Sequence, residues 1–190
     1  TGELLQSQLI KNVPGGMIHD FCITDRHLIF TSPSFRAVKR GRNYLEKFTY
    51  QRDAAQHVVV LDMDDLDVRR DFELEPGFQF HFGNAYTEKS GDIRFTLCST
   101  SEDDFVSHTA KALMRGELKE GGRTTLKEVV LKVNGETSIR SLTQELASHE
   151  FPQFNANYKG QFARYLYTVG KTQAGRQGES AVLRHDLRTG

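Results

Sequence analysis

The sequence predicts an all-β fold, on three observations. Short segments rich in β-branched and aromatic residues recur along the 190 residues. Turn signals such as Pro76-Gly77 and Asn134-Gly135 separate these segments. Apolar side chains recur at helical spacing in a single stretch, residues 103–118, so only one helix is predicted. Strands at this spacing are typical of a sandwich, a barrel or a propeller.

The strands differ in how strongly the pattern predicts them. Residues 57–62 carry a run of three valines, and residues 93–99 alternate apolar and polar side chains. Residues 171–179 are polar and rich in glycine, which predicts a loop. The predicted strands cover residues 17–24, 28–30, 57–62, 67–72, 78–86, 93–99, 124–134, 137–142, 162–169 and 181–186.

The composition excludes some classes of protein. Lys and Arg together number 25, as do Asp and Glu, and this balance argues against a broad nucleic-acid surface. Cys22 and Cys98 lie in apolar strand patterns, so we expect buried free thiols and a reducing, cytoplasmic compartment. No apolar run reaches the roughly 18 residues of a membrane-spanning helix. The chain starts at Thr1 without a signal peptide, so we expect it to begin inside a longer chain or after processing.

His19 and His81 are the candidate site residues, because each lies in an apolar, strand-like segment. An imidazole in a buried strand needs a partner for each ring nitrogen, and a metal ion is one partner that two such histidines could share. A satisfied structural histidine is the other reading, and no local spacing motif links the two positions. The other histidines are expected to be structural, with His27 solvated in a turn; they are His27, His57, His108, His149 and His185.

Four segments resemble motifs of the carotenoid cleavage oxygenase family. Residues 17–24 (MIHDFCIT) are similar to the family motif M-x-H-D-F-A-I-T, and residues 80–88 (FHFGNAYTE) are similar to F-H-x-x-N-A-Y-E. Residues 150–155 (EFPQFN) are similar to E-L-P-R-I-N, and residues 162–167 (FARYLY) are similar to Y-R-Y-x-Y. The order of the segments matches the family, and together they span most of the chain.

The resemblance implies about three blades of a seven-bladed β-propeller with ferrous iron, Fe(2+), on its axis. Residues 103–118 would form a helical excursion from one blade. His19 and His81 match two of the four iron-binding, catalytic histidines of the family. Glu150 matches one of three glutamates that hold those histidines from behind, and its place in the chain favours a pairing with His81. Phe21, Phe80 and Phe82 are expected to pack in the blade cores.

The resemblance also implies an activity. A non-haem Fe(II) dioxygenase would cleave a conjugated C=C bond of a carotenoid, apocarotenoid or stilbene with O2, giving two carbonyl products. The alternatives are a retinoid-type isomerase or isomerohydrolase on the same iron site, a propeller that only binds an apolar ligand, and a generic zinc protein. Two iron histidines and two glutamates have no counterpart in the 190 residues, so we expect a middle segment of a longer catalytic domain. Peripheral membrane contact is a further expectation, whereas the oligomeric state stays open.

Overall fold

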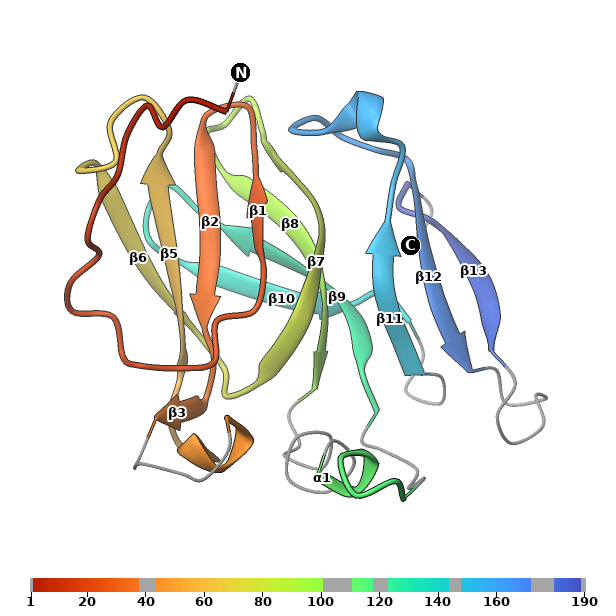
Figure 1. The fold of residues 1–190 in the computed structure, drawn as a ribbon. Helices are drawn as coiled ribbons and strands as arrows, with labels where there is room; N and C mark the ends of the chain where they lie inside the picture. Colours follow the sequence, from red (N-terminus) through yellow and green to blue (C-terminus); the bar gives the residue numbers. More distant parts are fainter. Residues whose placement is uncertain are drawn as a thin grey trace.

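The structure is a computed structural model, which describes residues 2–37, 44–100, 111–117, 123–143, 148–171 and 180–188. Strands dominate it, and they form three antiparallel sheets and one small hairpin (Figure 1). The first sheet has the order β1-β2-β5-β6, with adjacent strands antiparallel. Its strands are β1 (Phe21–Ile23), β2 (His27–Ser32), β5 (Gln56–Asp62) and β6 (Arg69–Leu74).

The second and third sheets have the same up-and-down construction. Their orders are β10-β9-β8-β7 and β11-β12-β13. The strands of the second sheet are β7 (Phe78–Thr87), β8 (Ile93–Thr100), β9 (Thr125–Leu131) and β10 (Thr137–Ser141). Those of the third are β11 (Ser148–Gln153), β12 (Tyr165–Lys171) and β13 (Ala181–Asp186). The small hairpin and the short helices are β3 (Phe35–Ala37), β4 (Phe48–Tyr50), η1 (Leu45–Lys47), α1 (Lys111–Leu113) and η3 (Ala156–Tyr158).

The first strands of the three sheets lie side by side. β7 packs against both β1 and β11, and Figure 1 shows it between them. Each sheet then runs outward strand by strand from this centre. Consecutive antiparallel meanders whose first strands meet are typical of neighbouring blades in a β-propeller.

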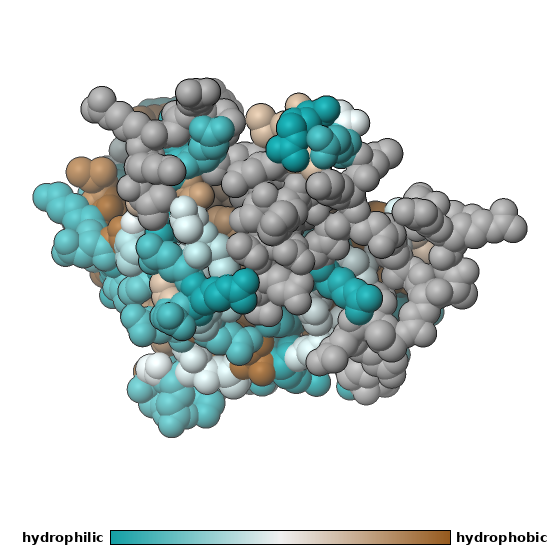
Figure 2. All heavy atoms as spheres, turned by 90° about the horizontal axis from the view of Figure 1, so that it is seen from below, coloured by the Kyte–Doolittle hydropathy of each residue, from teal (hydrophilic) through white to brown (hydrophobic). Residues whose placement is uncertain are grey.

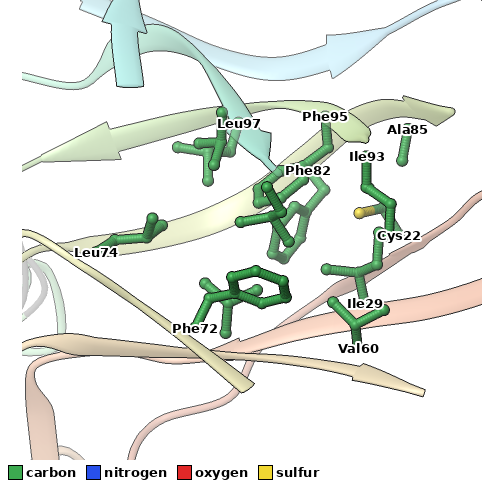
Figure 3. Close-up of a cluster of buried hydrophobic side chains, with 13 residues drawn as sticks. Cys22, Ile29, Val60, Phe72, Leu74, Phe82, Ala85, Ile93, Phe95 and Leu97 are labelled. Atoms are coloured by element: carbon green, nitrogen blue, oxygen red, sulfur yellow. The ribbon is translucent and has the colours of Figure 1, made fainter. Parts of the chain in front are cut away.

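The main core lies between the first two sheets. Figure 3 shows Ile29, Val60 and Phe72 of the first sheet facing Phe82 and Phe95 of the second. These side chains are buried, and each contributes about 1.5–3 kcal/mol relative to an exposed position. The alternation in residues 93–99 therefore has the predicted cause, because Ile93, Phe95 and Leu97 all enter this core.

The third blade contains a buried polar cluster. His149 is 3% exposed, and its Nδ1 lies 3.1 Å from the Thr168 hydroxyl. The same hydroxyl lies 2.9 Å from Nε2 of His185. Burial lowers the pKa of His149, and the neighbouring His185 lowers it further; burial also lowers the pKa of His185. Both histidines have the structural role that the sequence predicted.

Several predicted elements differ from the structure. Half of the predicted helix, residues 103–110, lies outside the described residues, and α1 covers only residues 111–113 of the remainder. Leu113 and Met114, expected on the packed side of that helix, are each 62% exposed, while Ala112 is buried. Phe21 was expected in the core and is instead 59% exposed, because Cys22 takes the inward position of β1.

His27 also differs from the prediction, since it begins β2 and is not a solvated turn residue. Its Nδ1 lies 3.2 Å from the Thr24 hydroxyl, and partial burial lowers its pKa. The strands β3, β4 and β11 were not predicted. The first two are only three residues long, and Pro152 argues against a strand in β11.

The cysteines agree with the prediction. Cys22 and Cys98 are buried free thiols, and burial raises the pKa of both. A buried thiol with a raised pKa forms little thiolate and is therefore chemically inert.

We expect Phe95→Ala to lower the free energy of unfolding by about 3–5 kcal/mol, because it leaves a cavity between two blades. Phe21→Ala is the matched control, since Phe21 is exposed, and its effect should stay within about 0.5 kcal/mol. Urea unfolding monitored by circular dichroism measures both. Equal losses in the two variants would contradict the core described here.

We expect the protein to lose stability as the pH falls below about 6.5. Because burial lowers the pKa of His149 and His185 in the folded state, the unfolded chain binds protons first. Their contribution is therefore complete above the unfolded pKa and is lost as the pH falls through the folded pKa. Urea midpoints between about pH 5.5 and 7.5 measure this slope. Replacing both histidines by glutamine should reduce it, and an unchanged slope would exclude the cluster as its source.

Candidate functional site

The packing of β1 against β7 brings His19 and His81 together. Their ring centroids are 5.3 Å apart, with the ring planes at 86°. Two imidazoles that each reach one ion at about 2.1 Å would be separated by about this distance. The fold thus places side by side two histidines that are far apart in the sequence.

The surroundings of His19 differ from the expectation of a buried strand. His19 lies two residues before β1 and is exposed. The Phe80 ring packs against it edge-on, with centroids 5.1 Å apart. The strand prediction began too early because the backbone at Met17 bonds to Phe35 and not to a neighbouring strand of the sheet.

His81 is half-buried and has a carboxylate behind it. Its Nδ1 lies 2.8 Å from Oε2 of Glu150, which comes from β11 in the third blade. With Nδ1 protonated, the ring donates to this oxygen, and its Nε2 keeps a lone pair. Burial raises the pKa of Glu150, while the hydrogen bond from His81 pulls it partly back.

An irregularity in β11 aims Glu150 at His81. The register of β11 with β12 shifts between Glu150 and Gln153, and Phe151 has φ of 54°. This left-handed backbone is uncommon for a bulky residue. The Phe151 amide donates to Glu150 Oε2 at 3.1 Å, and the Phe151 ring centroid lies 4.8 Å from that of His81. One bulge therefore supplies both a carboxylate and an aromatic ring to the same histidine.

The sequence pattern indicated no site role for Phe151. The residue before a proline is biased toward extended backbone, so nothing in the pattern predicted a left-handed conformation. The bulge needs the packed third blade to hold it.

Gly83 allows the third blade to approach β7 closely. A Cβ at this position would lie against the Thr96 hydroxyl, 3.1 Å from Leu166 and 3.4 Å from Pro152. The absence of a side chain two residues after His81 thus permits the approach that brings Glu150 within hydrogen-bond distance.

Asn84 and Gly160 join the loop after β11 to β1 and β7. The Asn84 amide donates to the carbonyls of Tyr158 and Gln161, at 3.2 and 2.5 Å. Gly160 has φ of 77° and forms bridges with both Thr24 and Tyr86. The loop after β11 therefore closes over β1 and β7 at the upper end in Figure 1.

The donor set within the described part of the chain is two imidazoles and one carboxylate. Among those residues, neither nitrogen of His19 nor Nε2 of His81 hydrogen-bonds a protein group. No group of three or more His, Cys, Asp or Glu side chains there is arranged to hold a metal ion. Of the remaining histidines, His57 lies 3.5 Å from Glu73 at the surface, and His108 lies outside the described residues.

The chain is similar to known proteins over its full length. A family model described as "Retinal pigment epithelial membrane protein" matches residues 1–190. The apocarotenoid-15,15'-oxygenase of Synechocystis sp. is 26% identical, over 100% of this chain and 39% of its own length. A carotenoid 9,10(9',10')-cleavage dioxygenase 1 of Phaseolus vulgaris is 28% identical, over 90% of this chain and 31% of its own. The chain thus spans less than two fifths of these relatives.

Solved structures give the same fold. A chimera of ACO and RPE65 superposes with a TM-score of 0.72 at 21% identity, covering 92% of this chain and 36% of the chimera. Cobalt-substituted ACO of Synechocystis superposes with a TM-score of 0.68 at 20% identity, covering 92% and 37%. The predicted all-β propeller segment is confirmed. In the part of the chain that the structure describes, no helix is long and apolar enough to cross a membrane.

The matched family model, the order of the histidine motifs and the propeller blades agree with one another. The chain belongs to the retinal pigment epithelial membrane protein family, which includes the carotenoid and apocarotenoid cleavage oxygenases.

Proposed function

We propose that this chain is the middle segment of a longer non-haem iron dioxygenase, in which His19 and His81 bind Fe(2+) and Glu150 orients His81. The observation that carries the proposal is the constellation itself: two imidazoles side by side, one of them hydrogen-bonded to a carboxylate from a third blade. The missing ligands would come from the parts of the protein that relatives have and this chain does not span.

The chemistry of the donor set fits ferrous iron. Neutral imidazole suits Fe(II), and a carboxylate on the far ring nitrogen fixes the tautomer and increases the basicity of the ligand. The relative solved with cobalt in place of its own metal supports metal dependence in this family. When bound, the iron would supply the activation of O2.

The aromatic residues around the histidines would act by orienting the ligands. The rings of Phe80 and Phe151 flank the imidazoles at centroid distances of 5.1 and 4.8 Å. Aromatic rings there give the site an apolar border suited to a conjugated substrate.

The proposed substrate is a carotenoid, an apocarotenoid or a stilbene, cleaved with O2 at a conjugated double bond to two carbonyl products. The names of the relatives from Synechocystis and Phaseolus vulgaris support the carotenoid and apocarotenoid classes.

We also propose a cytoplasmic protein with peripheral membrane contact. The free thiols of Cys22 and Cys98 support a reducing compartment. The exposed Leu113 and Met114 of the α1 region support contact with an apolar surface. Figure 2 views the face on which α1 lies, where the described side chains are mostly hydrophilic with small hydrophobic patches.

The test uses the complete gene product, reconstituted anaerobically with Fe(II) and compared with His81→Ala. We expect stoichiometric iron and O2-dependent formation of two aldehydes or ketones, both lost in the variant. His57→Ala is the matched control, because His57 also faces a glutamate but lies at the surface of the first blade. Iron without O2 uptake would favour the isomerohydrolase, and absence of iron would leave a propeller that only binds an apolar ligand.

We expect Glu150→Gln to weaken metal binding by about 10- to 100-fold, because a neutral amide polarises the His81 ring less and fixes its tautomer less firmly. Isothermal titration with Fe(II) under anaerobic conditions measures the change. Glu73→Gln alters the other His–Glu pair, beside His57, and should bind iron as the wild type does. Wild-type affinity in Glu150→Gln would remove Glu150 from the site.

A further inference from the structure

Asp20 links the two candidate ligands through their backbones. It follows His19, and its Oδ1 accepts a hydrogen bond from the amide of Phe21 at 2.8 Å. Its Oδ2 accepts one from the amide of Phe82 at 2.9 Å. Phe82 follows His81, so a single carboxylate ties the residue after one histidine to the residue after the other.

This link joins the first and second sheets, which share no strand pairing. β1 belongs to the first sheet and β7 to the second, and the two strands pack without being paired. At the far end, Gly160 bridges Thr24 of the first blade and Tyr86 of the second. Near the histidines, the Asp20 carboxylate performs the corresponding function, because it joins the start of β1 to the middle of β7.

The position of His19 makes such a link necessary. His19 precedes β1 and is exposed, so strand pairing does not hold its backbone. Two ligands of one ion must keep their relative position to within about 0.5 Å. The partners of Asp20 are the amides next to the two histidines, and its carboxylate therefore acts where their relative position is decided.

We propose that Asp20 is a positioning residue, which holds His19 and His81 at the separation needed to bind one metal ion. This inference rests on the proposed function of the histidine pair. It adds a role that concerns geometry alone, since Asp20 reaches the ligands through backbone amides and does not itself contact the ion.

The chemistry of the side chain explains why an aspartate is required. Two N–H donors approach two different oxygens. Asparagine has the same shape but a single acceptor, and its NH2 group would face one of the amides donor to donor. Glutamate keeps both acceptors on a stem that is one methylene longer. Asp20→Asn is therefore the isosteric test, and Asp20→Glu is the conservative variant.

The matched control is Asp92→Asn. Oδ1 of Asp92 accepts a hydrogen bond from the amide of Val133 at 2.9 Å, where the turn between β7 and β8 meets the turn between β9 and β10. The exchange therefore removes the charge of a carboxylate that bonds a backbone amide but leaves one acceptor for that amide, far from the histidines.

The experiment titrates the complete gene product with Co(II) and records its visible absorption, together with amide hydrogen exchange. In Asp20→Asn we expect Co(II) binding to weaken by about 10-fold, the absorption bands to shift, and the Phe82 amide to exchange faster. Asp20→Glu should recover part of the affinity. Asp92→Asn should bind Co(II) as the wild type does and leave exchange at Phe82 unchanged.

Two outcomes separate the inference from the proposed function. Wild-type Co(II) affinity and spectrum in Asp20→Asn, with faster exchange at Phe82, would overturn the positioning role. Absence of Co(II) binding in the wild type would overturn the proposed function instead. In that case, the ring signals of 13C-labelled His19 and His81 in the metal-free protein decide the inference: signals unchanged in Asp20→Asn would overturn it.

Discussion

The close packing of β7 between β1 and β11 is the constraint on which the rest of the structure depends. Each of these strands is the first of its sheet, so each exposes one edge to a neighbouring blade and not to another paired strand. Apolar contacts such as Phe82 with Phe95 stabilise the blades behind this centre. The same packing brings His19, His81 and Glu150 from three blades to one place.

Polar side chains replace strand pairing where the blades meet. Asp20 reaches from the first blade to the Phe82 amide, and Glu150 reaches from the third blade to His81. Asn84 reaches from the second blade to the carbonyls of the loop after β11. All three residues belong to the segments that resemble the family motifs. The motifs thus join blades as well as carrying the candidate ligands.

Irregular backbone conformations and shifts of strand register also occur close to the site. Phe151 has a left-handed φ, and the registers of β7 and β11 both shift near His81 and Glu150. A bulky residue in this region costs on the order of 1–3 kcal/mol, which the surrounding packing must offset. The bulge re-aims Glu150 toward the neighbouring blade, which a regular strand would not do.

The sequence by itself determined the fold class and many strands, and it named the candidate site residues. Alternation located residues 93–99 almost to the residue, because successive side chains of a strand point to opposite faces of the sheet. The tertiary structure alone decided that His19 is exposed, that Phe151 is left-handed and that Asp20 bonds to Phe82. These features depend on contacts between blades whose residues are distant along the chain, and local patterns carry no information about such contacts.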